Sequence, residues 1–223
     1  MRRDGGAGYL PALRWRFLTP GYDMVARYTT GERRFKERLL GWADLRPLER
    51  VVDLGCGTGT LLVAAGGQEP GPELIGVDRD LAVLRRARRK VQAAAVGVEL
   101  CLVDARSLPM ADGSVDVVVS SLFFHHLLSD AKSLVLAEIS RVLGIGGRLA
   151  VADWGAPRGG ASRVGAGVVR RFDGDEPTRD NLDGRLAELI ETAGFDDVIV
   201  RARLGVPLGV IEIITATRSL DRG

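Results

Sequence analysis

The stretch VVDLGCGTGT, residues 51–60, decides the fold. A short apolar run typical of a buried strand ends here in glycines at alternate positions, Gly55, Gly57 and Gly59. Glycine adopts positive φ readily and, because it has no Cβ, lets another group approach the backbone closely. Thr58 is a candidate cap for the helix that follows. The stretch predicts a strand, a tight turn and a helix, with a ligand at the carboxyl end of the strand.

Similar apolar runs alternate with helix-like segments along the rest of the chain, which is typical of a parallel sheet covered on both faces. The last two runs are separated by only a few residues, too few for a crossover helix, so they predict an antiparallel hairpin. We therefore expect an α/β fold with a mostly parallel seven-stranded sheet. The runs are 51-VVDL, 74-LIGVD, 98-VELCLVD, 115-VDVVVSS, 147-GRLAVADW, 198-VIVRARL and 210-VIEIITATR.

Three aspartates stand at the ends of the first three runs. Asp53 precedes the glycine turn, where a carboxylate would repel a pyrophosphate and attract a cationic ammonium. Asp78 follows about 20 residues after the glycines, where an acid commonly accepts hydrogen bonds from ribose hydroxyls. Asp104 could accept the exocyclic amine of an adenine. An amine-bearing tail, a ribose and an adenine, in that order, describe S-adenosylmethionine.

These segments resemble the class I S-adenosylmethionine-dependent methyltransferases, in the group that includes quinone-biosynthesis methyltransferases. The resemblance covers about residues 50–154 and the terminal hairpin, and it implies the three-layer Rossmann-like methyltransferase fold. One departure is 143-LGIGG, where the family often has a proline before the paired glycines. The matching segments are 51-VVDLGCGTG, 76-GVDRD, 103-VDARSLPMADGSVDVVVSS, 122-LFFHHL and 138-EISRVLGIGGRLAVADW.

The resemblance also implies the cofactor site. It assigns the methionine moiety to Asp53 and the glycines of the first turn, the ribose to Asp78, the adenine to Asp104 with Ala105, and a place lining the pocket near the methionine to Ser120. The cofactor-binding residues predicted in this way are Asp53, Gly55, Gly57, Gly59, Asp78, Arg79, Asp104, Ala105 and Ser120.

The catalytic residues are left open. His125 and His126, the only histidines, follow the fourth run, where either could serve as a general base or simply pack at a helix start. Asp153 and Trp154 end the fifth run and could touch the acceptor. No metal site is predicted, because Cys56 and Cys101 lie far apart and form no ligand pattern.

We expect a single domain over residues 1–223, with a helical lid over residues 1–45, the cofactor core over 46–154, and a substrate loop, helix and hairpin over 155–223. Tyr22 or Tyr28 is expected to reach the site from the lid. The glycine-rich segment 155–180 shows no clear periodicity and is predicted to be a loop lining the substrate pocket.

Composition limits the partners. With 31 basic and 29 acidic residues the net charge is +2, which gives no argument for nucleic acid, and the 85-RRARRK cluster is expected to be a solvated helix face. No run is long and apolar enough for a membrane span. The two separated cysteines favour a reduced, cytoplasmic setting. The sequence does not indicate an oligomeric state.

The most consistent function is methyl transfer from S-adenosylmethionine to a small, largely apolar acceptor at oxygen, nitrogen or carbon. The segment 120-SSLFFHHL lacks the polar clamp of methylases that act on base or amide nitrogens. Two alternatives remain: a methyltransferase-like binding or regulatory protein without turnover, and a dinucleotide-dependent oxidoreductase. Asp53 and Thr60, which replaces the last glycine of the dinucleotide fingerprint, weigh against the latter.

Overall fold

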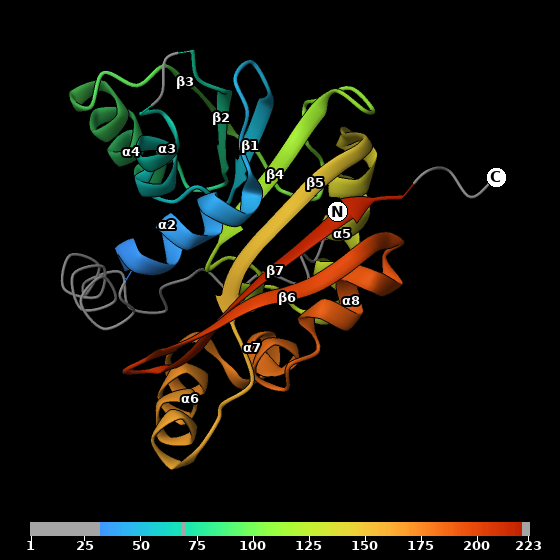
Figure 1. Cartoon of the computed structure of the whole chain (residues 1–223). Coiled ribbons are helices and arrows are strands. Elements are labelled where there is room, and N and C mark those ends of the chain that lie inside the picture. The colour runs from blue at the N-terminus through green and yellow to red at the C-terminus, as the bar shows by residue number, and fades with distance from the viewer. Residues whose placement is uncertain (1–31, 68–69, 220–223) are drawn as a thin grey trace, which may run out of the picture.

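The computed structural model describes residues 32–67 and 70–219, and its centre is one seven-stranded sheet with strand order β3-β2-β1-β4-β5-β7-β6 (Figure 1). β1 to β5 run parallel, whereas β7 pairs antiparallel with both β5 and β6. The predicted mostly parallel sheet with a closing antiparallel hairpin is confirmed. The strands are β1 (Arg50–Leu54), β2 (Glu73–Asp78), β3 (Val98–Leu102), β4 (Val115–Ser121), β5 (Leu143–Trp154), β6 (Phe195–Val206) and β7 (Gly209–Arg218).

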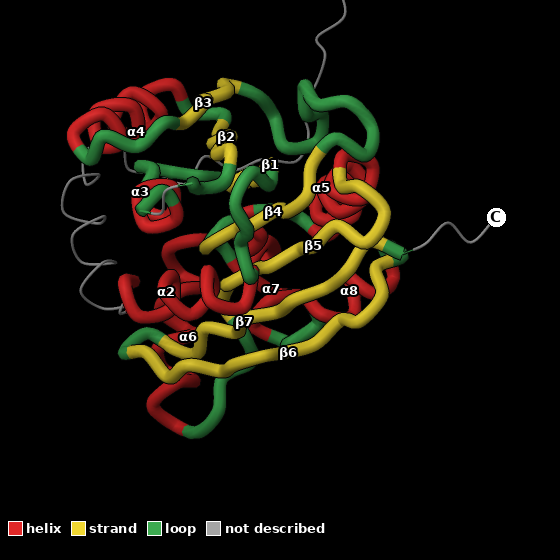
Figure 2. The backbone as a smooth tube through the Cα atoms, turned by 45° about the horizontal axis from the view of Figure 1, so that its top comes forward, coloured by secondary structure: helices red, strands yellow, loops and turns green. Residues whose placement is uncertain are grey.

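Helices pack on both faces of this sheet (Figure 2). Apolar side chains of α2, α3, α4 and α6 share one core cluster with one face, and those of α5 and α8 share a second cluster with the other. A short 3-10 turn, η1 (Phe124–His126), follows β4. The helices are α2 (Glu32–Ala43), α3 (Thr60–Ala65), α4 (Leu81–Ala93), α5 (Ser129–Val142), α6 (Gly160–Asp173), α7 (Asp175–Leu182) and α8 (Leu186–Thr192).

The segment predicted to be a substrate loop, 155–180, is largely helical, so that prediction is wrong. It forms α6 and most of α7. The reason lies in the small residues of α6: a Cβ on Gly165 would come within 2.5 Å of the backbone of Leu208, so the glycine lets α6 approach the β6–β7 turn closely. Glycines that serve helix packing hid the helical periodicity.

The predicted lid is described only in part. Its last portion is helix α2, which packs against β4, β5, β7 and α3. Tyr22 and Tyr28 lie outside the described residues, so their approach to the site stays a prediction. None of the helices within the described segments is long and apolar enough to cross a lipid bilayer.

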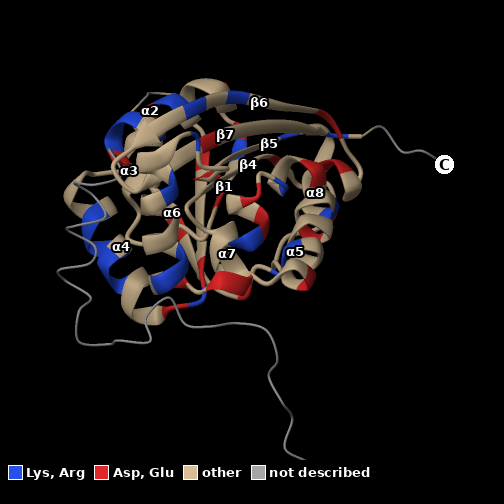
Figure 3. Ribbon diagram, turned by 90° about the horizontal axis from the view of Figure 1, so that it is seen from below, with Lys and Arg blue, Asp and Glu red and all other residues tan. Residues whose placement is uncertain are grey.

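The basic cluster 85-RRARRK lies on α4, where Figure 3 shows basic residues along the helix. The four arginines of this cluster are exposed, as predicted for a solvated face. Lys90 differs from them: its ammonium turns inward and donates to the hydroxyls of Thr58 and Thr60 at the start of α3. The cluster therefore combines a solvated surface with one internal anchor for the glycine turn.

Candidate active site

The three glycines after β1 all adopt positive φ, of 70° at Gly55, 55° at Gly57 and 75° at Gly59. Their surroundings differ. A Cβ on Gly55 would come within 2.4 Å of the Phe123 ring, and one on Gly59 would come within 3.2 Å of Ala87. A Cβ on Gly57 would meet nothing closer than 4.0 Å. Two of the glycines therefore allow packing within the protein, and Gly57 leaves open the side on which a ligand can approach.

This difference predicts different costs for alanine at two of these positions. Gly55→Ala is expected to lower the free energy of unfolding by about 2 kcal/mol, because it adds a clash with Phe123 to the strain of positive φ. Gly57→Ala is expected to lower the free energy of unfolding by about half as much, because it adds only the strain of positive φ. Urea unfolding of both variants measures this, and equal losses would contradict the assignment of Gly55 to packing.

The predicted cap of α3 is wrong. Gly59, not Thr58, is the N-cap residue, and no side chain caps the helix. The Thr58 hydroxyl instead accepts a hydrogen bond from Lys90 Nζ at 2.9 Å, and the same ammonium reaches Thr60 Oγ1 at 2.8 Å. Lys90 thus ties the glycine turn to α4.

Asp53 is buried at the end of β1 with a relative exposure of 1%, and neither of its carboxylate oxygens has a hydrogen-bond partner in the described structure. Burial raises the pKa of Asp53 to about 7, against a partial offset from Lys36 of α2. A buried carboxylate without a donor is costly unless a cation or donor reaches it. An ammonium group is the kind of ligand that would satisfy it.

Asp78 ends β2 directly beside the glycine turn. Its Oδ2 accepts from the amide of Gly57 at 3.0 Å, and its Oδ1 accepts from the amide of Asp80 at 2.9 Å. Burial raises the pKa of this carboxyl. Each oxygen has one further lone pair, so Asp78 can hold the turn and still accept two ligand hydroxyls.

The expected adenine end lies after β3. Asp104 is bound by its neighbour Arg106, whose guanidinium donates to both carboxylate oxygens at 3.0 and 2.8 Å and holds the pKa of Asp104 down at about 2. Within the described residues, Oδ2 accepts a hydrogen bond only from Arg106, which leaves it able to take an amine. Ala105 is buried next to it, and Arg79 after β2 is exposed.

Ser120 is fully buried at the end of β4, and its hydroxyl donates to the carbonyl of Leu54 at 2.9 Å. That bond joins β4 to the last residue of β1, immediately before the glycine turn. The donor of Ser120 is therefore used within the sheet, where it fixes the turn's starting point.

Next to this turn, η1 is organised by Asp153 at the end of β5. One oxygen of Asp153 accepts from the amides of Phe123 and Phe124 at 3.0 and 2.8 Å. The other pairs with His125 Nδ1 at 2.7 Å and accepts from the amide of Trp154 at 2.7 Å. With four partners the Asp153 carboxylate is saturated, so its interactions are those of a positioning residue rather than of a contact to an acceptor.

The two histidines differ in their electrostatics. Burial lowers the pKa of His125, but the attraction of Asp153 and Asp173 outweighs it, so the pKa lies above its usual value. Burial and the adjacent His125 lower the pKa of His126 to about 3. His126 is thus a neutral imidazole, and a weak base for proton abstraction. The ring centroids of the two histidines lie 3.9 Å apart.

Sequence reasoning missed the groups supplied by distant helices. Lys36 comes from α2 and is only 9% exposed, and Asp173 comes from the end of α6. Lys132 of α5 is fully buried and bound to Asp180 of α7 at 3.0 Å. For Lys36 and Lys132 the sequence offered one signal, a lysine at an otherwise apolar position of a helix. Asp173 carried none, because its segment was expected to be a loop.

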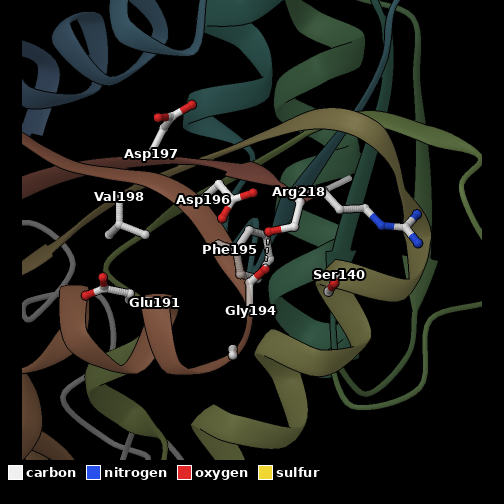
Figure 4. A pocket seen from close by; sticks show the side chains of 10 residues that line it. Ser140, Glu191, Gly194, Phe195, Asp196, Asp197, Val198 and Arg218 are labelled. Atoms are coloured by element: carbon white, nitrogen blue, oxygen red, sulfur yellow. Dashed lines mark hydrogen bonds between the residues drawn. The ribbon is translucent and has the colours of Figure 1, made fainter. Parts of the chain in front are cut away.

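A cavity of about 510 Å³ lies away from these groups (Figure 4). It is lined by residues at the end of α8, the start of β6 and the end of β7, among them Glu191, Asp196 and Arg218. Because β7 runs antiparallel to β5, with Arg148 opposite Thr217, this hollow lies at the amino ends of the parallel strands. It is on the edge of the sheet opposite the glycine turn.

The residues around the glycine turn, at the carboxyl ends of the parallel strands, fit S-adenosylmethionine. The unpartnered Asp53 carboxylate suits an ammonium, the free lone pairs of Asp78 suit ribose hydroxyls, and Gly57 leaves room for the ligand. A dinucleotide fits poorly, because its pyrophosphate would meet the Asp53 carboxylate.

Comparisons with known proteins agree with this geometry. The methyltransferase domain family matches residues 52–151. The demethylmenaquinone methyltransferase of Thermus thermophilus is 34% identical over 146 residues, which cover 65% of this chain and 66% of that protein's own length. The ubiquinone/menaquinone biosynthesis C-methyltransferase UbiE of Syntrophotalea carbinolica is 26% identical over 222 residues, which cover 91% and 92% of the two chains.

Among solved structures, the magnesium protoporphyrin IX methyltransferase of Synechocystis, crystallised with S-adenosylhomocysteine, superposes with a TM-score of 0.68. Its sequence identity is 19%, and the match covers 91% of this chain and 96% of that one. That likeness concerns the fold, whereas the sequence matches concern the family. The chain belongs to the class I S-adenosylmethionine-dependent methyltransferases.

Proposed function

We propose that the protein transfers the methyl group of S-adenosylmethionine to a small, largely apolar acceptor and releases S-adenosylhomocysteine. The observation that carries this proposal is the buried Asp53 carboxylate, which lacks any hydrogen-bond donor in the described structure and lies beside the glycine turn. An ammonium-bearing cofactor would supply that donor. Two relatives are named for methylation in menaquinone biosynthesis, so ring acceptors of quinone type are the first to assay.

The proposed roles of the residues follow from their positions. Asp53 would bind and orient the ammonium of the cofactor, and Asp78 would hold the ribose while keeping the amide of Gly57 in place. Bound in this way, the cofactor supplies a sulfonium-activated methyl group. Because the methyl group is already activated, positioning of the acceptor supplies much of the rate acceleration.

A methyl-transfer assay tests the proposal. Purified protein is incubated with S-adenosylmethionine labelled in the methyl group and a panel of hydroquinones, phenols and small amines. Label in an extracted product, with S-adenosylhomocysteine formed in equal amount, is the expected result. Gly57→Ala serves as a comparison, because it adds a methyl group on the open side of the turn and is expected to raise KM for the cofactor. Tight cofactor binding without turnover on a broad panel would contradict the proposal and favour a binding or regulatory role.

A further inference from the structure

Within the described residues, His125, His126 and Asp173 place their potential ligand atoms within 4.8 Å of one another. They come from two elements: the histidines from η1 after β4, and the aspartate from the last turn of α6. His125 Nε2 lies 3.9 Å from Asp173 Oδ2. In a tetrahedral site, ligand atoms that each lie about 2.0–2.1 Å from the ion are about 3.3–3.4 Å apart. A bound ion would therefore draw these two atoms together by about 0.5 Å, a shift that rotation of the side chains can supply.

Asp153 orients the ring of His125 in this cluster. It fixes His125 through Nδ1 at 2.7 Å and is itself held by three backbone amides, so the opposite nitrogen, Nε2, is aimed at Asp173. Metal-binding histidines almost always donate their second ring nitrogen to a carboxylate or carbonyl in this way, which fixes the tautomer and orients the ring.

The charges also balance. Asp153 and Asp173 have side chains that are 1% and 5% exposed, and together they would bring two negative charges to the cluster. The nearby buried ammonium of Lys132 is paired with Asp180 at 3.0 Å. A divalent cation would neutralise both Asp153 and Asp173.

We propose that His125, His126 and Asp173 bind a divalent transition-metal ion of the Zn²⁺, Co²⁺ or Fe²⁺ type, with Asp153 orienting His125. Two imidazoles and one carboxylate favour such an ion over Mg²⁺ or Ca²⁺, which prefer oxygen ligands. The site adjoins the glycine turn, because the Phe123 ring, two residues before His125, contacts Gly55. Three protein ligands leave a coordination position open. If the proposed methyl transfer holds, that position would take an oxygen of the acceptor and so hold it beside the methyl donor.

The test uses the full-length chain after removal of any histidine tag and after dialysis against a chelator. The chain has only two histidines, so an imidazole-bound metal can be assigned to this site. Co²⁺ is titrated while its visible d–d absorption is followed, and equilibrium dialysis against Zn²⁺ gives the stoichiometry. One equivalent of either metal, with a Co²⁺ spectrum of low coordination number, is expected.

Single substitutions test whether the three proposed ligands bind the metal. His126→Ala and Asp173→Asn are each expected to weaken metal binding at least about tenfold, since even residues that only orient a ligand cost 10–100-fold. Asp175→Asn is the matched control, because Asp175 is exposed, lies two residues from Asp173 and pairs with Arg179. The metal affinity of Asp175→Asn should equal that of the wild type. Circular dichroism checks that each variant is folded.

Absence of a Co²⁺ band together with no retained Zn²⁺ would overturn the site and leave His125 with a structural role only, bound to Asp153. Equal metal affinity in the wild type, His126→Ala and Asp173→Asn would do the same. Both readouts are independent of turnover. Titration of the same sample with S-adenosylmethionine shows whether the cofactor site is intact, so a failure here is distinguishable from a failure of the proposed function.

Discussion

Replacing Asp53 with asparagine is expected to stabilise the cofactor-free protein at pH 8 and to weaken its binding of S-adenosylmethionine. The carboxylate is buried without a hydrogen-bond donor in the described structure, and its pKa is raised to about 7. At pH 8 the folded protein therefore holds a charge that the unfolded chain would solvate freely. Asparagine removes that charge but also removes the anion to which the cofactor's ammonium would bind.

The pH dependence of stability has a definite sign. Because the folded pKa lies above the unfolded one, the folded state binds the extra proton, and stability falls as pH rises from about 4 through 7. Between pH 5 and 8 the wild type should lose roughly 2–3 kcal/mol that Asp53→Asn does not lose. Urea unfolding across this range measures the difference.

Asp116→Asn is the matched control for Asp53→Asn. Asp116 is an exposed aspartate of the adjacent strand β4, and it accepts from the amide of Arg50 at 2.8 Å. Its neutralisation should leave the pH profile of the wild type in place. Parallel pH profiles for the wild type and Asp53→Asn would contradict the raised pKa of Asp53.

Asp78→Ala is expected to weaken binding of S-adenosylmethionine at least about 100-fold. Hydrogen bonds to a charged group contribute about 1.5–3 kcal/mol each, and this carboxylate would accept two from the ribose. The variant also removes the acceptor of the Gly57 amide, so the glycine turn loses its link to β2. Calorimetric titration of the folded variant measures the loss.

The neighbouring acid, Asp80, gives a control of the opposite kind. It caps α4 by accepting from the amides of Ala82 and Val83 at 2.7 and 3.2 Å, and its side chain is not part of the predicted ribose site. Asp80→Ala should cost about 1 kcal/mol of stability and leave the cofactor affinity nearly unchanged. Equal loss of affinity in Asp78→Ala and Asp80→Ala would show that the effect comes from disturbing α4.

The sheet and its cofactor edge could be predicted because their signals are local. Apolar runs, alternate glycines and strand-ending aspartates lie within a few residues of one another, and parallel strands bring their carboxyl ends to one edge. The register confirms this, since β1 lies between β2 and β4 with Asp53 opposite Gly76 and Val119. The separate packing roles of Gly55 and Gly59 depend on Phe123 and Ala87, which no local pattern connects to the turn.

The lysines carry a signal that composition alone conceals. The chain has only three of them, which suggests no more than a bias toward arginine. In the structure each is bound internally: Lys36 to Glu32, Lys90 to two threonine hydroxyls, and Lys132 to Asp180. A compact ammonium on a slender stem fits such sites, where a planar guanidinium would not.

The helices of residues 155–180 could not be predicted, because they depend on tertiary contacts. The small residues of α6 read as a flexible loop until Gly165 is seen against the β6–β7 turn. The approach of Asp173 to His125 then follows from the end of that helix. A cluster assembled from η1 and α6 has no signature in sequence spacing.

The proposed activity depends most directly on which ligand binds beside the glycine turn. Calorimetric titration of the purified protein with S-adenosylmethionine, S-adenosylhomocysteine and NADH, at pH 7 in two buffers of different ionisation enthalpy, tests this in one experiment. We expect binding of the first two ligands and release of about half a proton, because Asp53 is about half protonated at pH 7 and must ionise to receive the ammonium. Binding of NADH without binding of S-adenosylmethionine would contradict the account.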